Sequence, residues 1–213
     1  MPEPSSVTIA TDGVTLPGDL TIPADATGLV VFAHGSGSSR KSPRNQFVAE
    51  QLVDSGLATL LFDLLTEAED RDRENRFDIE LLTDRLIAAR EWVGGREDVG
   101  DRPIGYFGSS TGAAAALRAA ARQPEGVEAV VSRGGRVDLA ESAFDAVDAP
   151  TRLIVGGADT QVLELNRDAA ARLACETDVT VVEGAGHLFE GQGELEAVAD
   201  HAGEWFVEHL TRD

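Results

Sequence analysis

Short apolar runs that alternate with helix-like segments recur along almost the whole chain, and this alternation limits the possible folds more than any other feature. The runs at 29–33 and 57–62 are almost wholly apolar, as is typical of strands that are covered on both faces. Further strand-like runs occupy 104–107, 127–131, 152–155 and 179–182. Strands alternating with helices predict an α/β fold, with a mainly parallel sheet of about eight strands and helices on both faces.

The N-terminal residues predict an antiparallel hairpin at one edge of this sheet. Residues 7–9 and 14–16 form its two arms, and Asp12-Gly13 is a typical two-residue turn between them. Helices are expected before Gly56 and at 78–93, 112–122, 162–173 and 195–210. The charge-dense stretch 67–76 predicts a solvated loop. Because the chain has no internal repeat or linker, residues 1–213 are expected to form a single domain.

The chain is strongly acidic, with 38 Asp and Glu residues against 18 Lys and Arg residues and a formal net charge of −20. No basic patch is available to neutralise phosphates, so nucleic acid and anionic membranes are poor partners. The acidic residues are scattered along the chain, which argues against a disordered acidic tail. One hypothesis is a halophilic protein, because concentrated salt suppresses the self-repulsion of an acidic domain. The alternative is an ordinary acidic protein.

Sequence features also bear on the compartment and on cofactors. The chain has no apolar run of about 18 residues, which a membrane-spanning helix requires. Its N-terminus lacks a basic segment followed by an apolar one, so no signal peptide is predicted and a cytoplasmic location is expected. With Cys175 as the one cysteine, no intrachain disulfide can form, and this residue is expected to serve in packing. The four histidines form no HExxH-type ligand pair, so neither a metal nor another cofactor is expected.

The strongest local motif is the pentapeptide 108–112, which matches G-x-S-x-G with Ser110 at its centre. Strand-like residues precede it and helix-like residues follow it. A strand-to-helix turn this tight needs small residues beside the serine and places the hydroxyl at the carboxyl end of the sheet. Ser110 is therefore the candidate nucleophile. The alternative is a glycine- and serine-rich turn without chemistry.

A serine hydroxyl is a weak nucleophile until a base removes its proton. Asp159 and His187 both follow predicted strands on glycine-rich loops, in the chain order serine, acid, histidine. We expect His187 to accept the Ser110 proton and Asp159 to orient the imidazole. Asp63 and Asp138 also follow strands, and either could be the acid instead.

The loop His34-Gly35-Ser36-Gly37 follows an apolar strand and could help to bind a developing oxygen anion. Backbone N–H groups aimed at such an oxygen are usually the largest catalytic contribution. The N–H groups of Ser36 and of Thr111, which directly follows the nucleophile, are the expected oxyanion-hole donors. His34 is expected to stabilise the loop rather than to carry a proton, and it is also a candidate substrate contact.

A basic cluster follows the same loop. Arg40, Lys41 and Arg44 lie close together in a chain that has few basic residues. They could bind a substrate carboxylate or phosphate, with Arg40 as the first candidate for substrate binding. They could equally pair with nearby Asp and Glu residues, and the sequence leaves both interpretations open.

The loop at 34–37, the elbow at 108–112, Asp159 within G-G-A-D and His187 within G-A-G-H occur in this order. Together they resemble the α/β-hydrolase superfamily, and over nearly the whole chain its compact dienelactone hydrolase-like group. Dienelactone hydrolases proper use a cysteine nucleophile where this chain has Ser110. The resemblance therefore implies carboxylic-ester hydrolysis rather than dienelactone as the substrate. Only residues 134–150 could form a cap, so the site is expected to be open or covered by the charged stretch 67–76.

The predicted function is hydrolysis of a small carboxylic ester, thioester or lactone by a Ser-His-Asp triad, through an acyl-serine intermediate. Acyl transfer to an alcohol, or peptidase action, would use the same residues. From a different class, a non-catalytic ligand-binding protein on a hydrolase scaffold is the alternative, because fold does not imply function. The expected partner is a small-molecule ester, and the sequence leaves its identity and the oligomeric state open.

Overall fold

The structure is a computed structural model that describes residues 2–211. Its strands are β1 (Ser5–Thr11), β2 (Val14–Thr21), β3 (Leu29–Ala33), β4 (Ala58–Phe62), β5 (Ile104–Ser109), β6 (Ala129–Arg133), β7 (Thr151–Gly156) and β8 (Thr177–Val182). They form one eight-stranded sheet in the order β1-β2-β4-β3-β5-β6-β7-β8. Strands β3 to β8 are parallel, whereas β1 and β2 form an antiparallel hairpin that pairs with β4 at one edge.

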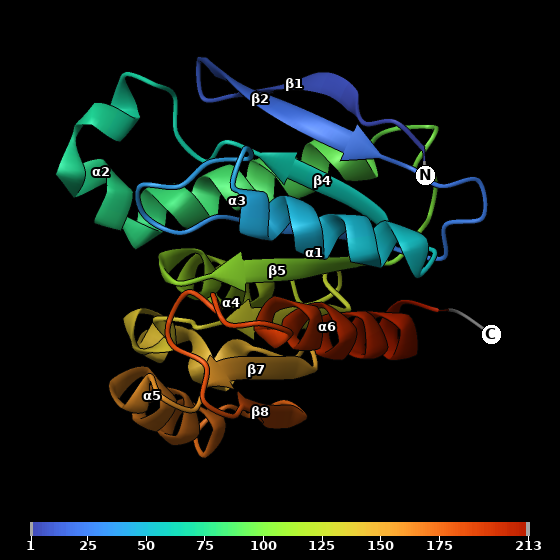
Figure 1. Cartoon of the computed structure of the whole chain (residues 1–213). Coiled ribbons are helices and arrows are strands. Elements are labelled where there is room, and N and C mark those ends of the chain that lie inside the picture. Colours follow the sequence, from blue (N-terminus) through green and yellow to red (C-terminus); the bar gives the residue numbers. More distant parts are fainter. Residues whose placement is uncertain (1, 212–213) are drawn as a thin grey trace.

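Helices cover both faces of this sheet. They are α1 (Pro43–Asp54), η1 (Glu69–Arg71), α2 (Arg73–Phe77), α3 (Ile79–Gly94), α4 (Thr111–Arg122), η2 (Val137–Ala146), α5 (Thr160–Ala170) and α6 (Glu194–Leu210). Helices α1 and α6 pack together on one face, and α3, α4 and α5 cover the other (Figure 1). Among residues 2–211, no helix is both long and apolar enough to cross a bilayer.

Local sequence explains where several elements begin. The β1–β2 turn holds Asp12 at φ 43° and Gly13 at φ 79°, the positive angles that a two-residue hairpin turn requires. Helix α1 begins after Ser42, whose side chain accepts a hydrogen bond from the Asn45 N–H. The Asp78 carboxylate caps α3 in the same way, at 3.1 Å from the Leu81 nitrogen. Each cap satisfies a backbone donor that has no partner within its helix.

The α4 helix lies centrally against the sheet and is built mostly from alanine. Its alanines at 113–116, 119 and 120 are buried. Small side chains allow the helix axis to approach the sheet closely, and they fix the position of its first turn relative to the end of β5. The residue that joins β5 to α4 is Ser110.

The predicted α/β-hydrolase architecture is confirmed, with its mainly parallel sheet and N-terminal hairpin. Some element bounds differ from the expectation. The strand expected at 127–131 begins at Ala129, because its ladder with β5 starts where Gly105 faces that residue. The helix expected at 162–173 spans 160–170, because it begins immediately after Asp159.

The stretch 67–76 is solvated as expected, because neither η1 nor α2 has a buried residue, but the expectation of a loop was wrong, because these two helices form there. Thr66 and Glu69 cap each other: each backbone N–H donates to the other's side chain, at 2.8 and 3.2 Å. The Asp72 carboxylate accepts the Glu74 N–H at 2.9 Å and so begins α2. Acidic side chains here serve as helix caps, which is why a dense run of charge is compatible with helix.

Candidate active site

Ser110 is held in strained backbone geometry at the carboxyl end of β5, with φ 51° and ψ −118°. Glycines on both sides of it are required by close packing. A Cβ atom on Gly108 would lie 2.5 Å from the Ala113 Cα, and one on Gly112 would lie 2.1 Å from the carbonyl oxygen of Ala33. Positive φ at a non-glycine residue is costly, and such strain is concentrated at functional sites. The geometry is that of the predicted nucleophile elbow.

Asp159 and His187 meet at the same edge of the sheet. Asp159 follows β7 and precedes α5, and His187 follows β8. The His187 Nδ1 lies 2.7 Å from the Asp159 Oδ2. Because a carboxylate at this position accepts the Nδ1–H, it leaves the His187 Nε2 free to act as a base. The His187 side chain is 40% exposed, so its imidazole is accessible from solvent.

The turn after β6 places His187 beside the elbow. The Ser110 N–H donates to the Arg133 carbonyl oxygen at 3.2 Å. The next residue, Gly134, has φ 53°, and a Cβ there would lie 3.5 Å from the His187 Nδ1. Within residues 2–211, the structure has no hydrogen bond between the Ser110 hydroxyl and the His187 ring. The two groups are therefore neighbours through the 133–134 backbone rather than by a direct bond.

The other two candidate acids are occupied elsewhere. Asp63 accepts the Arg40 backbone N–H at 2.7 Å and also pairs with that arginine's guanidinium. Asp138 receives two hydrogen bonds from Arg136, at 2.9 and 2.8 Å. Of the three acids that the sequence left open, the structure brings Asp159 to the histidine.

The oxyanion-hole donors are placed differently from each other. Thr111 is the first residue of α4, and its backbone N–H has no acceptor within residues 2–211, as expected at a helix N-terminus. The Ser36 N–H instead donates to the Thr111 hydroxyl at 2.9 Å. A Cβ on Gly35 would lie 3.1 Å from the Ser110 Cβ, so the loop packs directly on the elbow. The Thr111 side chain thus holds the loop against α4 and occupies one of the two predicted donors.

His34 is buried, with 6% of its surface exposed, and both of its ring nitrogens are engaged. Its Nε2 accepts the Leu64 N–H at 3.0 Å, so its Nδ1 carries the proton that is donated to the Gly35 carbonyl oxygen at 3.0 Å. This geometry matches the loop-stabilising role that the sequence favours. Burial lowers the pKa of His34 below its ordinary value of 6.5.

We expect the wild-type protein to lose more stability on acidification than a His34→Gln variant. The neutral ring contributes stability that is fully present above pH 6.5 and is lost as the pH falls toward the lowered pKa of the folded state. Glutamine can accept the Leu64 N–H but does not titrate. Urea unfolding at fixed KCl concentration, between about pH 7 and about pH 5, measures the difference. Parallel pH profiles for the two proteins would contradict this role for His34.

The three residues of the basic cluster have different partners in the structure. The Arg40 guanidinium pairs with Asp63 and, at 3.3 Å, with Asp19, and the Lys41 Nζ lies 2.9 Å from Asp19. These two residues pair with nearby acids, as one of the two interpretations expected, and a substrate contact for Arg40 stays a prediction. Arg44 is different, because its nearest carboxylate is that of Glu190, at 3.9 Å.

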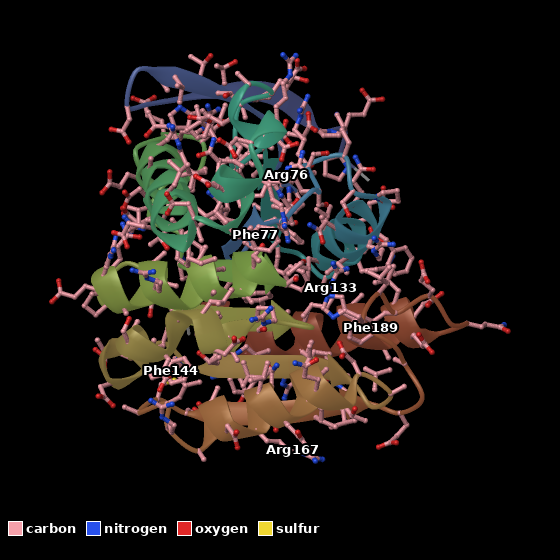
Figure 2. The ribbon with its side chains drawn as sticks, turned by 90° about the vertical axis from the view of Figure 1, so that its left-hand side faces the viewer. Arg76, Phe77, Arg133, Phe144, Arg167 and Phe189 are labelled. Atoms are coloured by element: carbon pink, nitrogen blue, oxygen red, sulfur yellow. The ribbon has the colours of Figure 1, made fainter. Side chains whose placement is uncertain are left out.

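Two features at the carboxyl end of the parallel strands were not predicted from the sequence. Figure 2 looks onto the carboxyl ends of the parallel strands and labels Arg133 of β6 and Phe77 of α2 on this side of the molecule. Arg133 is a buried arginine that ends β6 after two valines and Ser132, and a charged residue at the end of this buried strand was the available signal. Phe77 is 46% exposed, and a Cβ on Gly37 would lie 4.0 Å from the Arg76 guanidinium. The Arg76 side chain of α2 therefore reaches the loop at 34–37.

Solved structures share this architecture. The chain has a TM-score of 0.96 and 52% identity to the crystal structure of a dienelactone hydrolase from Anabaena variabilis, covering 98% of this chain and 99% of that one. Est1E from Butyrivibrio proteoclasticus has a TM-score of 0.82 at 17% identity, covering 96% and 98% of the two chains. At that identity the likeness concerns the fold alone.

Sequence relatives cover the chain over most of its length. A Mycobacterium tuberculosis protein provisionally named a phosphoribosyl transferase is 55% identical over 204 residues, which are 96% of this chain and 46% of that protein. The chain thus spans about half the length of these relatives. An uncharacterised protein of the same organism is 30% identical over 196 residues, covering 79% of this chain and 67% of the relative. The family described as alpha/beta hydrolase fold matches residues 28–184, and the chain belongs to this family.

Proposed function

We propose that this chain is a serine hydrolase that cleaves a small carboxylic ester, thioester or lactone through an acyl-Ser110 intermediate. The observation that carries the proposal is the 2.7 Å contact between Asp159 and His187, at the edge where Ser110 stands on a strained elbow. The 52% identity to a protein named dienelactone hydrolase supports hydrolytic chemistry. The cysteine-to-serine difference that the sequence indicates favours a carboxylic ester over dienelactone.

In the proposed mechanism, the His187 Nε2 takes the Ser110 proton while the Ser110 Oγ attacks the carbonyl carbon of the substrate. The C=O π electrons move to the oxygen, and the Thr111 N–H stabilises the resulting anion. When the tetrahedral intermediate collapses, the C–O bond to the leaving group breaks and His187 returns the proton to it. Water, deprotonated by His187, then attacks the acyl carbon. The bond between this carbon and the Ser110 Oγ breaks, His187 returns the proton to Oγ, and the acid is released. The Ser110–His187 bond forms with substrate, since such bonds are often long in free enzymes.

Small substrates fit the open surroundings of the site. Between β6 and β7 the chain forms only η2, which packs against α4 rather than over the elbow. Helix α2 instead approaches the neighbouring loop at 34–37 through the Arg76 side chain. We assign no phosphoribosyl transfer to this chain, because that name belongs to proteins of which it spans 46%. The elbow and the acid–histidine pair provide groups for acyl transfer.

Labelling with a fluorophosphonate probe tests the proposal. An activated Ser110 should label in the wild-type protein, and labelling should disappear in Ser110→Ala. Concentrated KCl in the assay prevents unfolding of a strongly acidic chain from being mistaken for inactivity. A folded wild-type protein that neither labels nor cleaves any of a panel of acyl esters would instead be a ligand-binding protein on a hydrolase scaffold.

Asp159→Asn should lower kcat by about 10⁴-fold with little change in the fold. The amide would present an N–H toward the Nδ1 of His187 and favour the tautomer whose Nε2 cannot accept the Ser110 proton. Stopped-flow or spectrophotometric assays with p-nitrophenyl acetate measure the loss. Asp138→Asn is the matched control, since Asp138 pairs with Arg136, and its kcat should remain close to that of the wild type. If kcat fell further in Asp138→Asn than in Asp159→Asn, Asp159 would not be the acid that orients His187.

A further inference from the structure

Arg133 is a buried cation without a counter-charge in the part of the chain that the structure describes. It is the last residue of β6, and 9% of its surface is exposed. Its Nη1 is buried without a hydrogen-bond partner, and within residues 2–211 its guanidinium forms no ion pair. Burying an unpaired guanidinium is expensive, so this arrangement needs a physical reason. Arginines elsewhere in the chain, such as Arg40 and Arg136, reach carboxylates.

A second arginine lies near it. Arg44 is in the first turn of α1, and its Nε is also buried without a partner. Among the described residues, its one carboxylate contact is the long one to Glu190, whose side chain is 72% exposed. Burial and the nearby charge of Arg44 lower the pKa of Arg133 to about 10, so Arg133 is still protonated at neutral pH. Two like charges are thus brought together in a chain that has 38 acidic residues available to separate them.

The pair lies on the α1 side of the nucleophile elbow. Ser109 and Arg133 face each other in the parallel ladder between β5 and β6, so their side chains point to the same face of the sheet. The Ser109 hydroxyl donates to the Asn45 Oδ1 at 3.1 Å, and Asn45 follows Arg44 in α1. The Arg133 carbonyl oxygen accepts the Ser110 N–H. The Arg133 backbone thus contacts the residue that would carry the acyl group, and its side chain lies on the face of the sheet that α1 covers.

We propose that Arg133 and Arg44 form a subsite for a dianionic group of the substrate, of the kind that a phosphate monoester carries. This inference rests on the proposed ester hydrolysis and names its substrate class as phosphate-bearing esters. A phosphate group has a charge of about −1.5 to −2 at pH 7, which matches two guanidinium groups better than a carboxylate does. Guanidinium groups bind phosphate oxygens by strong, directional hydrogen bonds. In a chain of net charge −20, a local pair of cations offsets the repulsion that the rest of the chain exerts on an anion.

Titration calorimetry with inorganic phosphate at fixed ionic strength tests the subsite without catalysis. We expect Arg133→Gln and Arg44→Gln each to weaken phosphate binding by about tenfold or more. Arg96→Gln removes the same charge from a pair with Asp98 on the connection that leads into the amino end of β5, and should bind phosphate like the wild type. Acetate should bind more weakly than phosphate. Absence of phosphate binding, equal binding of acetate, or binding unchanged in the variants would overturn the proposal.

Kinetics with a matched pair of esters links the subsite to the reaction. The wild type should have a higher kcat/KM for 1-acetylglycerol 3-phosphate than for 1-acetylglycerol. This preference should fall by about tenfold or more in the two variants and persist in Arg96→Gln. If Arg133→Gln does not fold, the Arg44→Gln variant provides the test, because Arg44 is partly exposed and its replacement should be tolerated. Equal cleavage of both esters by the wild type would overturn the subsite and leave the proposed hydrolase. Failure of Ser110 to label, with phosphate binding intact, would overturn the hydrolase and leave an anion site.

Discussion

Replacing Ser110 with glycine is expected to abolish turnover and, at the same time, to stabilise the fold. The proposed reaction has no nucleophile without the hydroxyl, and loss of a catalytic serine lowers kcat by about 10⁶-fold in serine hydrolases. The gain in stability has a separate cause. Ser110 has φ 51°, where a Cβ atom is strained and glycine is not. After allowance for the greater freedom of glycine in the unfolded chain, we expect about 1 kcal/mol of net stabilisation.

Ser110→Ala separates the two effects, because alanine removes the hydroxyl but keeps the Cβ. Its kcat should fall as far as that of the glycine variant, whereas its free energy of unfolding should stay close to the wild-type value. Urea unfolding and p-nitrophenyl acetate hydrolysis, both in concentrated KCl, provide the two measurements. If either variant kept a kcat close to that of the wild type, Ser110 would not be the nucleophile. Equal stability of the alanine and glycine variants would show that the backbone strain is negligible.

Gly112→Ala should be among the most destabilising single substitutions in this chain. A Cβ at this position would lie 2.1 Å from the carbonyl oxygen of Ala33 and 2.6 Å from that of His34, so the start of α4 must move away from the end of β3. Overpacking against backbone cannot be relieved by a side-chain rotation. We expect a loss of about 3 kcal/mol or more in the free energy of unfolding. Esterase activity should also fall, because the same movement displaces the Thr111 N–H and Ser110.

Gly95→Ala is the matched control for this prediction. Gly95 follows α3 with φ −87°, and a Cβ there would make only an ordinary contact, at 3.6 Å from the Glu91 carbonyl oxygen. Its free energy of unfolding should change by no more than about 0.5 kcal/mol. Chemical unfolding of both variants under one salt condition gives the comparison. If Gly112→Ala were as stable as Gly95→Ala, the elbow could relax around the added Cβ atom. The close packing at Gly112 would then contribute little to the free energy of unfolding.

Much of the fold could be predicted because the deciding interactions are local. The β1–β2 turn follows from the neighbouring residues Asp12 and Gly13, and the start of α3 follows from Asp78 three residues before the N–H that it caps. The elbow is also local, since its glycines and Ser110 are contiguous. The stretch 67–76 was misjudged for a reason of the same kind. Its acidic residues had been taken only as solvated charges, although Glu69 and Asp72 are helix caps.

The sequence by itself determined the α/β architecture and the candidates Ser110, Asp159 and His187, because hydrophobic periodicity, turn chemistry and strand-end loops are written in neighbouring residues. Only the tertiary structure decided which acid contacts the histidine and that the Thr111 hydroxyl accepts the Ser36 N–H. It also decided that Arg133 has no counter-charge among residues 2–211. These outcomes depend on distances between segments that are remote along the chain. With 38 acidic side chains available, charge alone cannot select a partner, and the packing of α1, the loops and the strand ends makes the choice.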